Sequence, residues 1–200
     1  MARITRKIGS LMSERLRYFW FWIRAYNRHG IHSPFVYELM EKAVFNQQGV
    51  EYLFMTNKRF REFSYFNRKR MRLLIKLLNF YKPSQLVWMG NNHQNMFDFL
   101  EGIFQEIWFL QIKPDDKFVF ENELKSTDWL IVDVKSIDLE LIYPIKNRLS
   151  NDSKVFFLET DKDFFRLINE WKGKVELDFF FLKILLFRKE MKPQNFKLRS

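Results

Sequence analysis

Two hundred residues suit one ordinary domain, and 47% apolar with 29% charged residues can supply both a buried core and a solvated surface. Because the chain has no cysteine, disulfide bonds, thiolate metal sites and a cysteine nucleophile are excluded. The net charge of +10 gathers in residues 1–30, 58–76 and 183–200 around an acidic middle. That distribution is compatible with nucleic acid or a membrane surface as partner, although solvated helix faces are the preferred interpretation.

The first thirty residues contain no apolar segment followed by a small-residue cleavage site. No apolar run elsewhere approaches the roughly 20 residues that a helix needs to cross a bilayer. We therefore expect a cytoplasmic protein without a transmembrane segment.

Residues 11–27 are predicted to form a helix with one apolar seam, because apolar residues recur every three or four positions. The seam consists of Met12, Leu16, Phe19, Ile23 and Tyr26. A basic, aromatic, amphipathic helix can lie on a membrane, pack on its own domain or pair with a second subunit. Packing is preferred, since aromatic stripes on helices usually belong to a core.

A second helix is predicted after residue 33. Ser33 is a candidate N-cap, and Pro34 fits the first helical position, where its missing N–H costs nothing. His29 and His32 lie just before this helix. A chain with three histidines and no cysteine offers weak support for a metal site, so capping or hydrogen bonding is the better assignment for them.

Residues 46–62 are expected to be an irregular connection, and residues 63–81 a strongly basic helix. Phe66, Leu73, Leu77 and Phe80 are expected on its apolar face. Its cationic residues include Arg68, Lys69, Arg70 and Arg72. These side chains are candidates for phosphate contacts, but a solvated face is preferred.

The remainder of the chain alternates between strand and helix patterns. An apolar run at 86–89 is followed by Gly90 and by helical spacing, which is typical of a buried strand, a turn and a helix. Further strands are predicted at 107–112, 117–120, 129–134 and 154–159, helices near 141–149 and 164–171, and a strand-rich end at 175–199 with its turn near Leu182 or Pro193. This alternation predicts an α/β fold with an open, mostly parallel sheet.

The segment RHGIHSPFVYELMEKAVF resembles the N-terminal signature of a bacterial family of class I SAM-dependent methyltransferases. LVWMG, WLIVDV and KVFFLE follow in the order of that family's strands, and the similarity extends over roughly residues 24–199. The resemblance implies an N-terminal helical extension over residues 1–62 and a Rossmann-like methyltransferase-type domain over residues 63–200.

The resemblance also implies that S-adenosyl-L-methionine (SAM) binds at the carboxyl ends of the first strands. The positions that it assigns to the cofactor are Gly90, Asn91, Asn92, Gln111 and Asp133, with Glu159 toward the substrate. It assigns no catalytic residue, and the methyl acceptor stays open.

Several positions depart from the family's pattern. Asn91, Asn92 and His93 stand where smaller residues are usual after the first strand. The carboxylate expected to bind the ribose hydroxyls is replaced by Gln111 or Lys113, which leaves Asp115 and Asp116 as substitutes. Lys183 replaces a glycine expected among the terminal strands. These changes favour a degenerate member, a pseudoenzyme that binds SAM weakly or not at all.

Three functions remain open from the sequence. The chain is an active methyltransferase on an unknown acceptor, or a non-catalytic scaffold, or a basic module that contacts nucleic acid or a membrane surface. The scaffold interpretation includes a homo-oligomer, or a complex with an active homologue, formed through the helix at residues 11–27.

Overall fold

The computed structural model describes residues 2–27, 30–46, 50–114, 129–137, 149–158, 174–188 and 190–200. Its helices are α1 (Ala2–Arg24), α2 (Pro34–Leu39), α3 (Glu51–Thr56), α4 (Lys58–Glu62), α5 (Tyr65–Tyr81) and α6 (Gln94–Ile103), with a π-helical turn at Met40–Val44 and a 3-10 turn at Val134–Ser136. Its strands are β1 (Gln85–Met89), β2 (Trp108–Ile112), β3 (Trp129–Asp133), β4 (Lys154–Leu158), β5 (Lys174–Asp178), β6 (Leu182–Phe187) and β7 (Gln194–Lys197).

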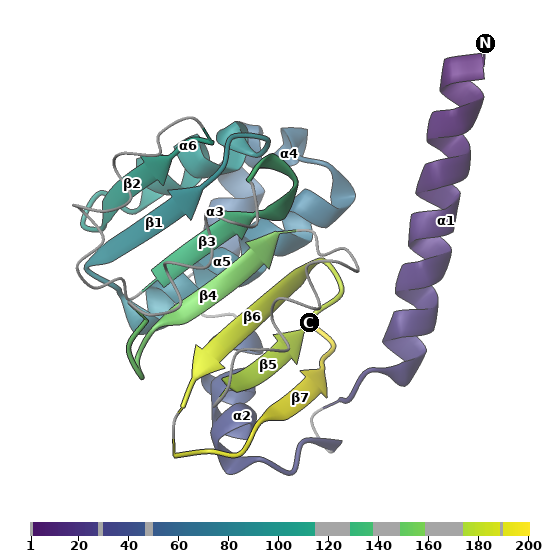
Figure 1. Ribbon diagram of the computed structural model, residues 1–200. Helices are drawn as coiled ribbons and strands as arrows, with labels where there is room; N and C mark the ends of the chain where they lie inside the picture. The colour runs from purple at the N-terminus through teal and green to yellow at the C-terminus, as the bar shows by residue number, and fades with distance from the viewer. Residues whose placement is uncertain are drawn as a thin grey trace.

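The described strands form one sheet in the order β2-β1-β3-β4-β6-β5-β7 (Figure 1). β1 pairs in parallel with β2 on one side and with β3 on the other, and β3 pairs in parallel with β4. β6 is antiparallel to both β4 and β5, so it runs against the other described strands. The chain therefore has an α/β fold with a mixed, mostly parallel sheet, as the strand and helix patterns predict.

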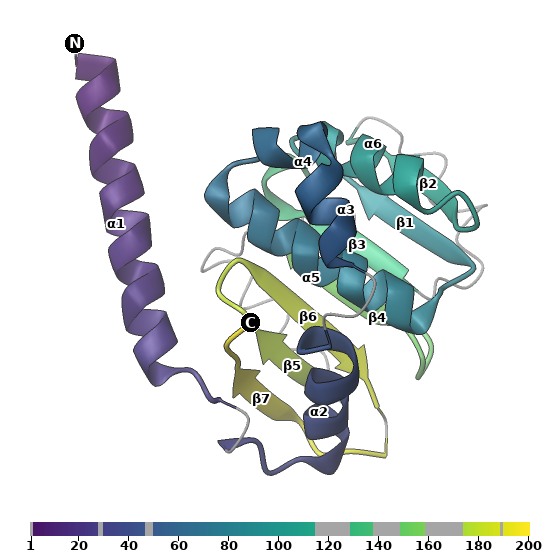
Figure 2. The ribbon, with the colours of Figure 1, turned by 180° about the vertical axis from the view of Figure 1, so that it is seen from behind.

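Both faces of the central strands are buried, which explains their continuous apolar sequences. On one face Leu86 and Trp88 of β1 join a core that also includes buried residues of α2, α5 and α6. In Figure 2 these helices, together with α3 and α4, lie across this face of the sheet. Val87 and Met89 point into a second apolar cluster on the opposite face.

The capping prediction for α2 is confirmed. Ser33 Oγ accepts a hydrogen bond from the backbone N–H of Val36 at 3.5 Å, and Pro34 occupies the first turn. The helical pattern continues to residue 44, but its second half is π-helical, and the backbone N–H of Phe45 bonds to the carbonyl of Met40. Apolar spacing cannot distinguish that wider turn from an α-helix.

The basic helix α5 begins at the cap Ser64 and matches its prediction, with two differences. Phe80 is 43% exposed and does not belong to the buried face. Arg70 is 4% exposed, and its Nε donates to the carbonyl of Phe181 at 2.6 Å. An arginine in an apparently solvated basic run therefore joins α5 to the turn between β5 and β6.

The prediction of an irregular connection at residues 46–62 is wrong for most of that segment. α3 and α4 lie there, and Asn57 separates them by capping the backbone N–H of Arg59 at 3.0 Å. Phe54 and Phe60 anchor the two helices to the core, with ring centroids 4.8 Å apart. Helices this short carry too few apolar positions to give a readable period.

The sequence left open whether the C-terminal strands turn near Leu182 or near Pro193, and the structure has a turn at both places. One joins β5 to β6 near Leu182, and the other lies between β6 and β7, before Pro193. Phe180 in the first turn has a φ of +71°. The predicted strand at 117–120 and the predicted helices near 141–149 and 164–171 lie outside the described residues, apart from Leu149.

The contacts described for side chains of α1 with the helices and strands of the fold come from one side of the helix, and most of its length stands clear in both ribbon views (Figures 1 and 2). Tyr18 and Phe21 pack against the ring of Phe180. The predicted seam does not face the core: four of its members are 46–58% exposed, namely Leu16, Phe19, Ile23 and Tyr26. Of the two packing arrangements expected for this seam, the single chain therefore does not supply the one against its own domain, and pairing with a second subunit stays a prediction. None of the described helices is both long enough and apolar enough to traverse a membrane.

Candidate functional site

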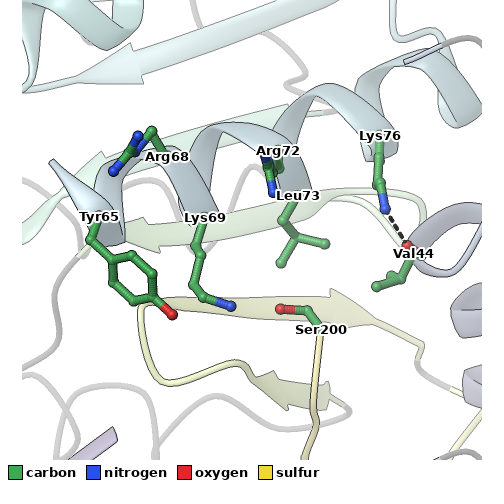
Figure 3. Close-up of a pocket in the computed structure, with 8 residues that line it drawn as sticks. All are labelled: Val44, Tyr65, Arg68, Lys69, Arg72, Leu73, Lys76 and Ser200. Atoms are coloured by element: carbon green, nitrogen blue, oxygen red, sulfur yellow. Dashed lines mark hydrogen bonds between the residues drawn. The ribbon is translucent and has the colours of Figure 1, made fainter. Parts of the chain in front are cut away.

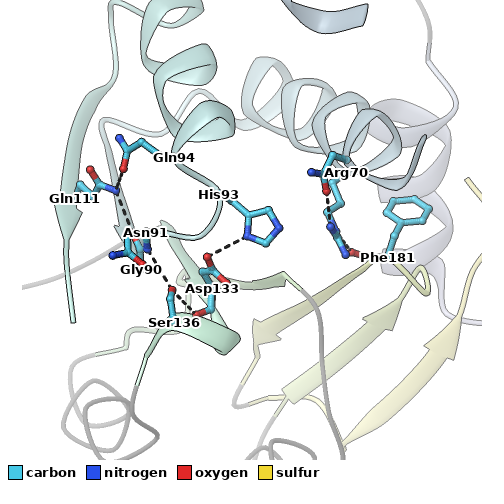
Figure 4. A network of polar contacts seen from close by, with 10 residues as sticks. Arg70, Gly90, Asn91, His93, Gln94, Gln111, Asp133, Ser136 and Phe181 are labelled. Carbon is cyan, nitrogen blue, oxygen red and sulfur yellow. Dashed lines mark hydrogen bonds and ion pairs between the residues drawn. The ribbon is translucent and has the colours of Figure 1, made fainter. Parts of the chain in front are cut away.

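The candidate site lies where the chain order of the sheet reverses. After β1 the chain passes through α6 to β2 on one side, and β3 later pairs with β1 on the other side. In open α/β sheets, ligands bind outside the carboxyl ends of the strands at such a switch point. β1 ends at Met89, directly before Gly90, and β3 ends at Asp133. The topology thus brings two of the predicted site residues together (Figure 4).

Gly90 turns the chain out of β1 in a conformation that requires glycine. Its φ is +114°, and its backbone N–H donates to the carbonyl of Ile112 at 2.8 Å. A Cβ at this position would lie 2.1 Å from Ser136 Oγ and 2.7 Å from Asp133 Cβ. The space beside the glycine is therefore filled by the chain after β3.

Ser136 closes the turn from the β3 side. Its hydroxyl accepts a hydrogen bond from the backbone N–H of Asn91 at 3.1 Å and donates to the carbonyl of Asp133 at 3.1 Å. A free backbone N–H in such a turn is a typical contact for an anionic ligand group. Here that N–H already has an internal acceptor.

Gln111 closes the turn from the β2 side. Its Nε2 donates to the carbonyl of Gly90 at 3.0 Å and to Gln94 Oε1 at 2.6 Å. The side chain thus joins β2 to the turn and to the first residue of α6 (Figure 4). At the position where the resemblance places a ribose-binding acid, the chain carries an amide that is already hydrogen-bonded.

Asp133 forms a buried pair with His93. The aspartate is fully buried, and its Oδ2 accepts from His93 Nδ1 at 3.0 Å, while the histidine side chain is 10% exposed. A buried carboxylate fixes the orientation and the tautomer of an imidazole, as it does in acid–base sites. Asp133 Oδ1 is buried without a hydrogen-bond partner among the described residues.

The structure brings together four of the positions assigned to the cofactor: Gly90, Asn91, Gln111 and Asp133. Asn92 is exposed in the turn and takes no part in the hydrogen bonds described above. Glu159, Asp115 and Asp116 lie outside the described residues.

Three members of the network were not assigned a role from the sequence: His93, Gln94 and Ser136. The contact of His93 with Asp133 could have been found from the sequence. His93 follows the strand β1 and its turn, and Asp133 ends a strand that pairs with β1. Parallel neighbours present their carboxyl ends at the same edge of the sheet, so a polar pair was predictable. No comparable signal identifies Ser136, whose position depends on the 3-10 turn after β3.

Comparisons with protein-family models, with curated proteins and with solved structures found no match to this chain.

Proposed function

We propose that the chain is a Rossmann-like, class I methyltransferase-type protein that acts as a non-catalytic scaffold. The strand–glycine–helix unit from β1 to α6 and the switch point between β1 and β3 support the Rossmann-like assignment. The reversed β6 is compatible with it, since doubly wound sheets often include an antiparallel strand.

The non-catalytic proposal depends on one observation: side chains of the protein itself already fill and hydrogen-bond the turn after β1. A SAM site needs close approach to the backbone after the first strand, but Ser136 occupies the side of Gly90 that the missing Cβ leaves open. The N–H of Asn91 and the carbonyl of Gly90 are bonded to Ser136 and Gln111. Buried polar groups that are already paired gain little from a ligand that must first displace their partners. We infer that these residues do not fit SAM.

Calorimetric titration with SAM and with S-adenosylhomocysteine tests this proposal. We expect no binding heat at millimolar ligand, because the N–H of Asn91 and the carbonyl of Gly90 are already paired within the chain. Micromolar binding that is lost in Asp133→Asn and kept in Asn92→Ala would contradict the scaffold proposal. Asn92→Ala is the matched control, since Asn92 lies in the same turn but outside the network.

An active methyltransferase is the second candidate, and one observation favours it. Asp133 Oδ1 is a buried acceptor without a partner in the described part of the chain, and it lies beside His93. An unsatisfied buried acceptor costs roughly 1–3 kcal/mol, which a ligand donor could recover. The titration separates the candidates, because only an active enzyme requires that Asp133 contact a bound cofactor.

The partner of the proposed scaffold is expected on α1. Leu16, Phe19 and Ile23, with Trp20, form an exposed stripe, and Tyr18 and Phe21 hold the opposite side of the helix against the fold. Exposed aromatic and aliphatic clusters of this kind mark protein interfaces. We propose that a second copy of the chain or an active homologue covers this stripe.

A further inference from the structure

A pocket of about 450 Å³ lies along α5, and none of the residues that line it belongs to the hydrogen-bond network at the β1 turn (Figure 3). Four cationic side chains of α5 line it: Arg68, Lys69, Arg72 and Lys76. The other lining residues are Val44, Tyr65, Leu73 and Ser200. The expectation that the basic residues of α5 form only a solvated face is therefore incomplete, because four of them line a cavity and Arg70 is buried.

Aromatic rings hold two of these cations in place. The Lys69 ammonium lies 5.3 Å from the ring centroid of Tyr18 and 5.6 Å from that of Tyr65. The Arg72 guanidinium lies 5.3 Å from the ring centroid of Phe54. Cation–π contacts restrict the side chain but leave N–H donors at the edge of the group for another ligand. These cations are thus oriented before any ligand arrives.

Among the described residues, none with an acidic side chain lines the pocket, and none of the four cations forms an ion pair. By contrast, a second pocket that contains Arg59 also contains Glu62 and Asp98. Lys76 Nζ donates to the carbonyl of Val44 at 2.8 Å, and burial, helped by nearby Arg72, lowers the pKa of Lys76 against the opposing influence of Glu51. The described surroundings therefore leave positive charge in the pocket that an anion would neutralise.

The spacing of the cations indicates a ligand with more than one phosphate. At 1.5 Å of rise per residue, Arg68 and Lys76 are separated by about 12 Å along the helix, too far for one phosphate to contact both. Tyr65, at the end of the pocket near Arg68, is 45% exposed and offers an aromatic ring to a base. The volume falls in the usual range for small-molecule sites. We propose that this pocket binds a nucleoside di- or triphosphate, with its phosphates on the cations of α5 and its base on Tyr65.

Titration of the full chain with ADP, pyrophosphate and adenosine tests the proposal. We expect ADP to bind, pyrophosphate to compete with it, and adenosine alone to bind at least about tenfold more weakly, since charge-assisted contacts to phosphate dominate. Arg68→Gln with Arg72→Gln should weaken ADP binding by about tenfold or more. The control pair Lys58→Gln with Lys192→Gln removes the same charge from exposed positions outside the pocket and should leave ADP binding within about twofold.

Tyr65 provides a second, independent readout. Tyr65→Ala should weaken ADP binding several-fold more than pyrophosphate binding, since pyrophosphate loses only the orientation that the Tyr65 ring gives to Lys69. Tyr65→Phe should retain both, because a base stacks on either ring. Thermal unfolding of each variant shows whether the fold is intact. The proposal is overturned if ADP does not bind at millimolar concentration or if the control pair weakens binding as much as the pocket pair. Tighter binding of a single-stranded oligonucleotide than of ADP, lost in the same pocket pair, would overturn it in favour of a nucleic-acid site.

Discussion

Gly90 is the residue on which the geometry of the β1 turn depends. Its φ of +114° is strained for any other residue, and a Cβ would overlap Ser136 Oγ at 2.1 Å. The strained backbone costs about 1–3 kcal/mol and overpacking a similar amount, so Gly90→Ala should destabilise the fold by at least about 2 kcal/mol. Urea unfolding measures this difference.

Gly102 is the matched control for that substitution. It lies in α6, and nothing lies within 4 Å of where its Cβ would be. Gly102→Ala should therefore be neutral or stabilise by roughly 0.5–1 kcal/mol, through helix propensity alone. Equal destabilisation by the two substitutions would show that the contact with Ser136 does not constrain the turn.

Tyr81 gives a prediction that depends on pH. Its ring packs edge-on against Trp129, and burial raises the pKa of its phenol from 10.0 to about 12, with Glu38 acting in the same direction and Arg188 opposing. Because the unfolded chain ionises first, stability should fall as pH rises from about 10 to about 12. Spectrophotometric titration should show a late tyrosine step that Tyr81→Phe removes. Tyr37→Phe, at an exposed tyrosine, should keep that step.

The roles of some residues could be predicted from the neighbouring sequence, and the roles of others could not. Ser33 and Pro34 were predictable as a helix start, because capping depends on the local chain. Asp133 was predictable as the end of a strand, but its bond to His93 joins positions 40 residues apart. The contact between Ser136 and the Gly90 turn depends on a short 3-10 turn and has no sequence signature.

At the scale of elements, a buried ion pair joins β5 to β6, with Glu176 on β5 and Lys183 on β6. Lys183 Nζ contacts Glu176 Oε1 at 2.6 Å, and the two side chains are 3% and 10% exposed. Lys183→Met should cost roughly 3–5 kcal/mol, because it leaves a buried carboxylate without its partner. Replacing both residues, as Glu176→Leu with Lys183→Met, should restore most of that stability. Urea unfolding of the three variants checks this order.

Acid should reduce the cost of Lys183→Met. Asp178 faces Lys183 across the strands, and burial raises the pKa of its carboxyl despite hydrogen bonding to Phe180 and the charge of Lys183. A carboxyl whose native pKa is raised destabilises the fold while it is ionised, and the charge of Lys183 offsets part of this penalty for Asp178. As pH falls and Asp178 is protonated, the penalty disappears, and the loss of Lys183 costs less stability. Lys42→Met is the control, since its pair with Glu38 is exposed and should contribute at most about 1 kcal/mol. A cost for Lys183→Met no larger than for Lys42→Met would contradict the structural role of the buried pair.

The central strands were predictable, whereas the short helices were not. β1, β3 and β4 carry continuous apolar runs because both of their faces are buried, so their positions could be predicted closely. α3 and α4 were missed because five or six residues do not establish a helical period. Strand order was also hidden, since the reversal of β6 follows from tertiary pairing.

At the scale of the whole molecule, one side of α1 presents apolar side chains that the single chain leaves exposed to solvent. Leu16, Phe19 and Ile23, together with Trp20, repeat at the spacing of a helix-packing face. Arg15, Arg17 and Arg24 come from the same helix, so two paired copies would bring like charges near each other. Association through this stripe should therefore tighten as salt screens the arginines, whereas binding to nucleic acid or an anionic membrane should weaken.

Light scattering coupled to size-exclusion chromatography tests self-association through α1. We expect light scattering to give the wild type a mass of at least two chains at micromolar concentration. The double variant Trp20→Ser with Ile23→Ser should have a mass near the 24.8 kDa of one chain. The control pair Met55→Ser with Phe80→Ser alters apolar residues exposed on other helices and should keep the larger mass. A wild type that stays at the mass of one chain at low and high salt would exclude a second copy and leave an active homologue as the proposed partner. Dissociation by the control pair would instead place the contact elsewhere on the fold.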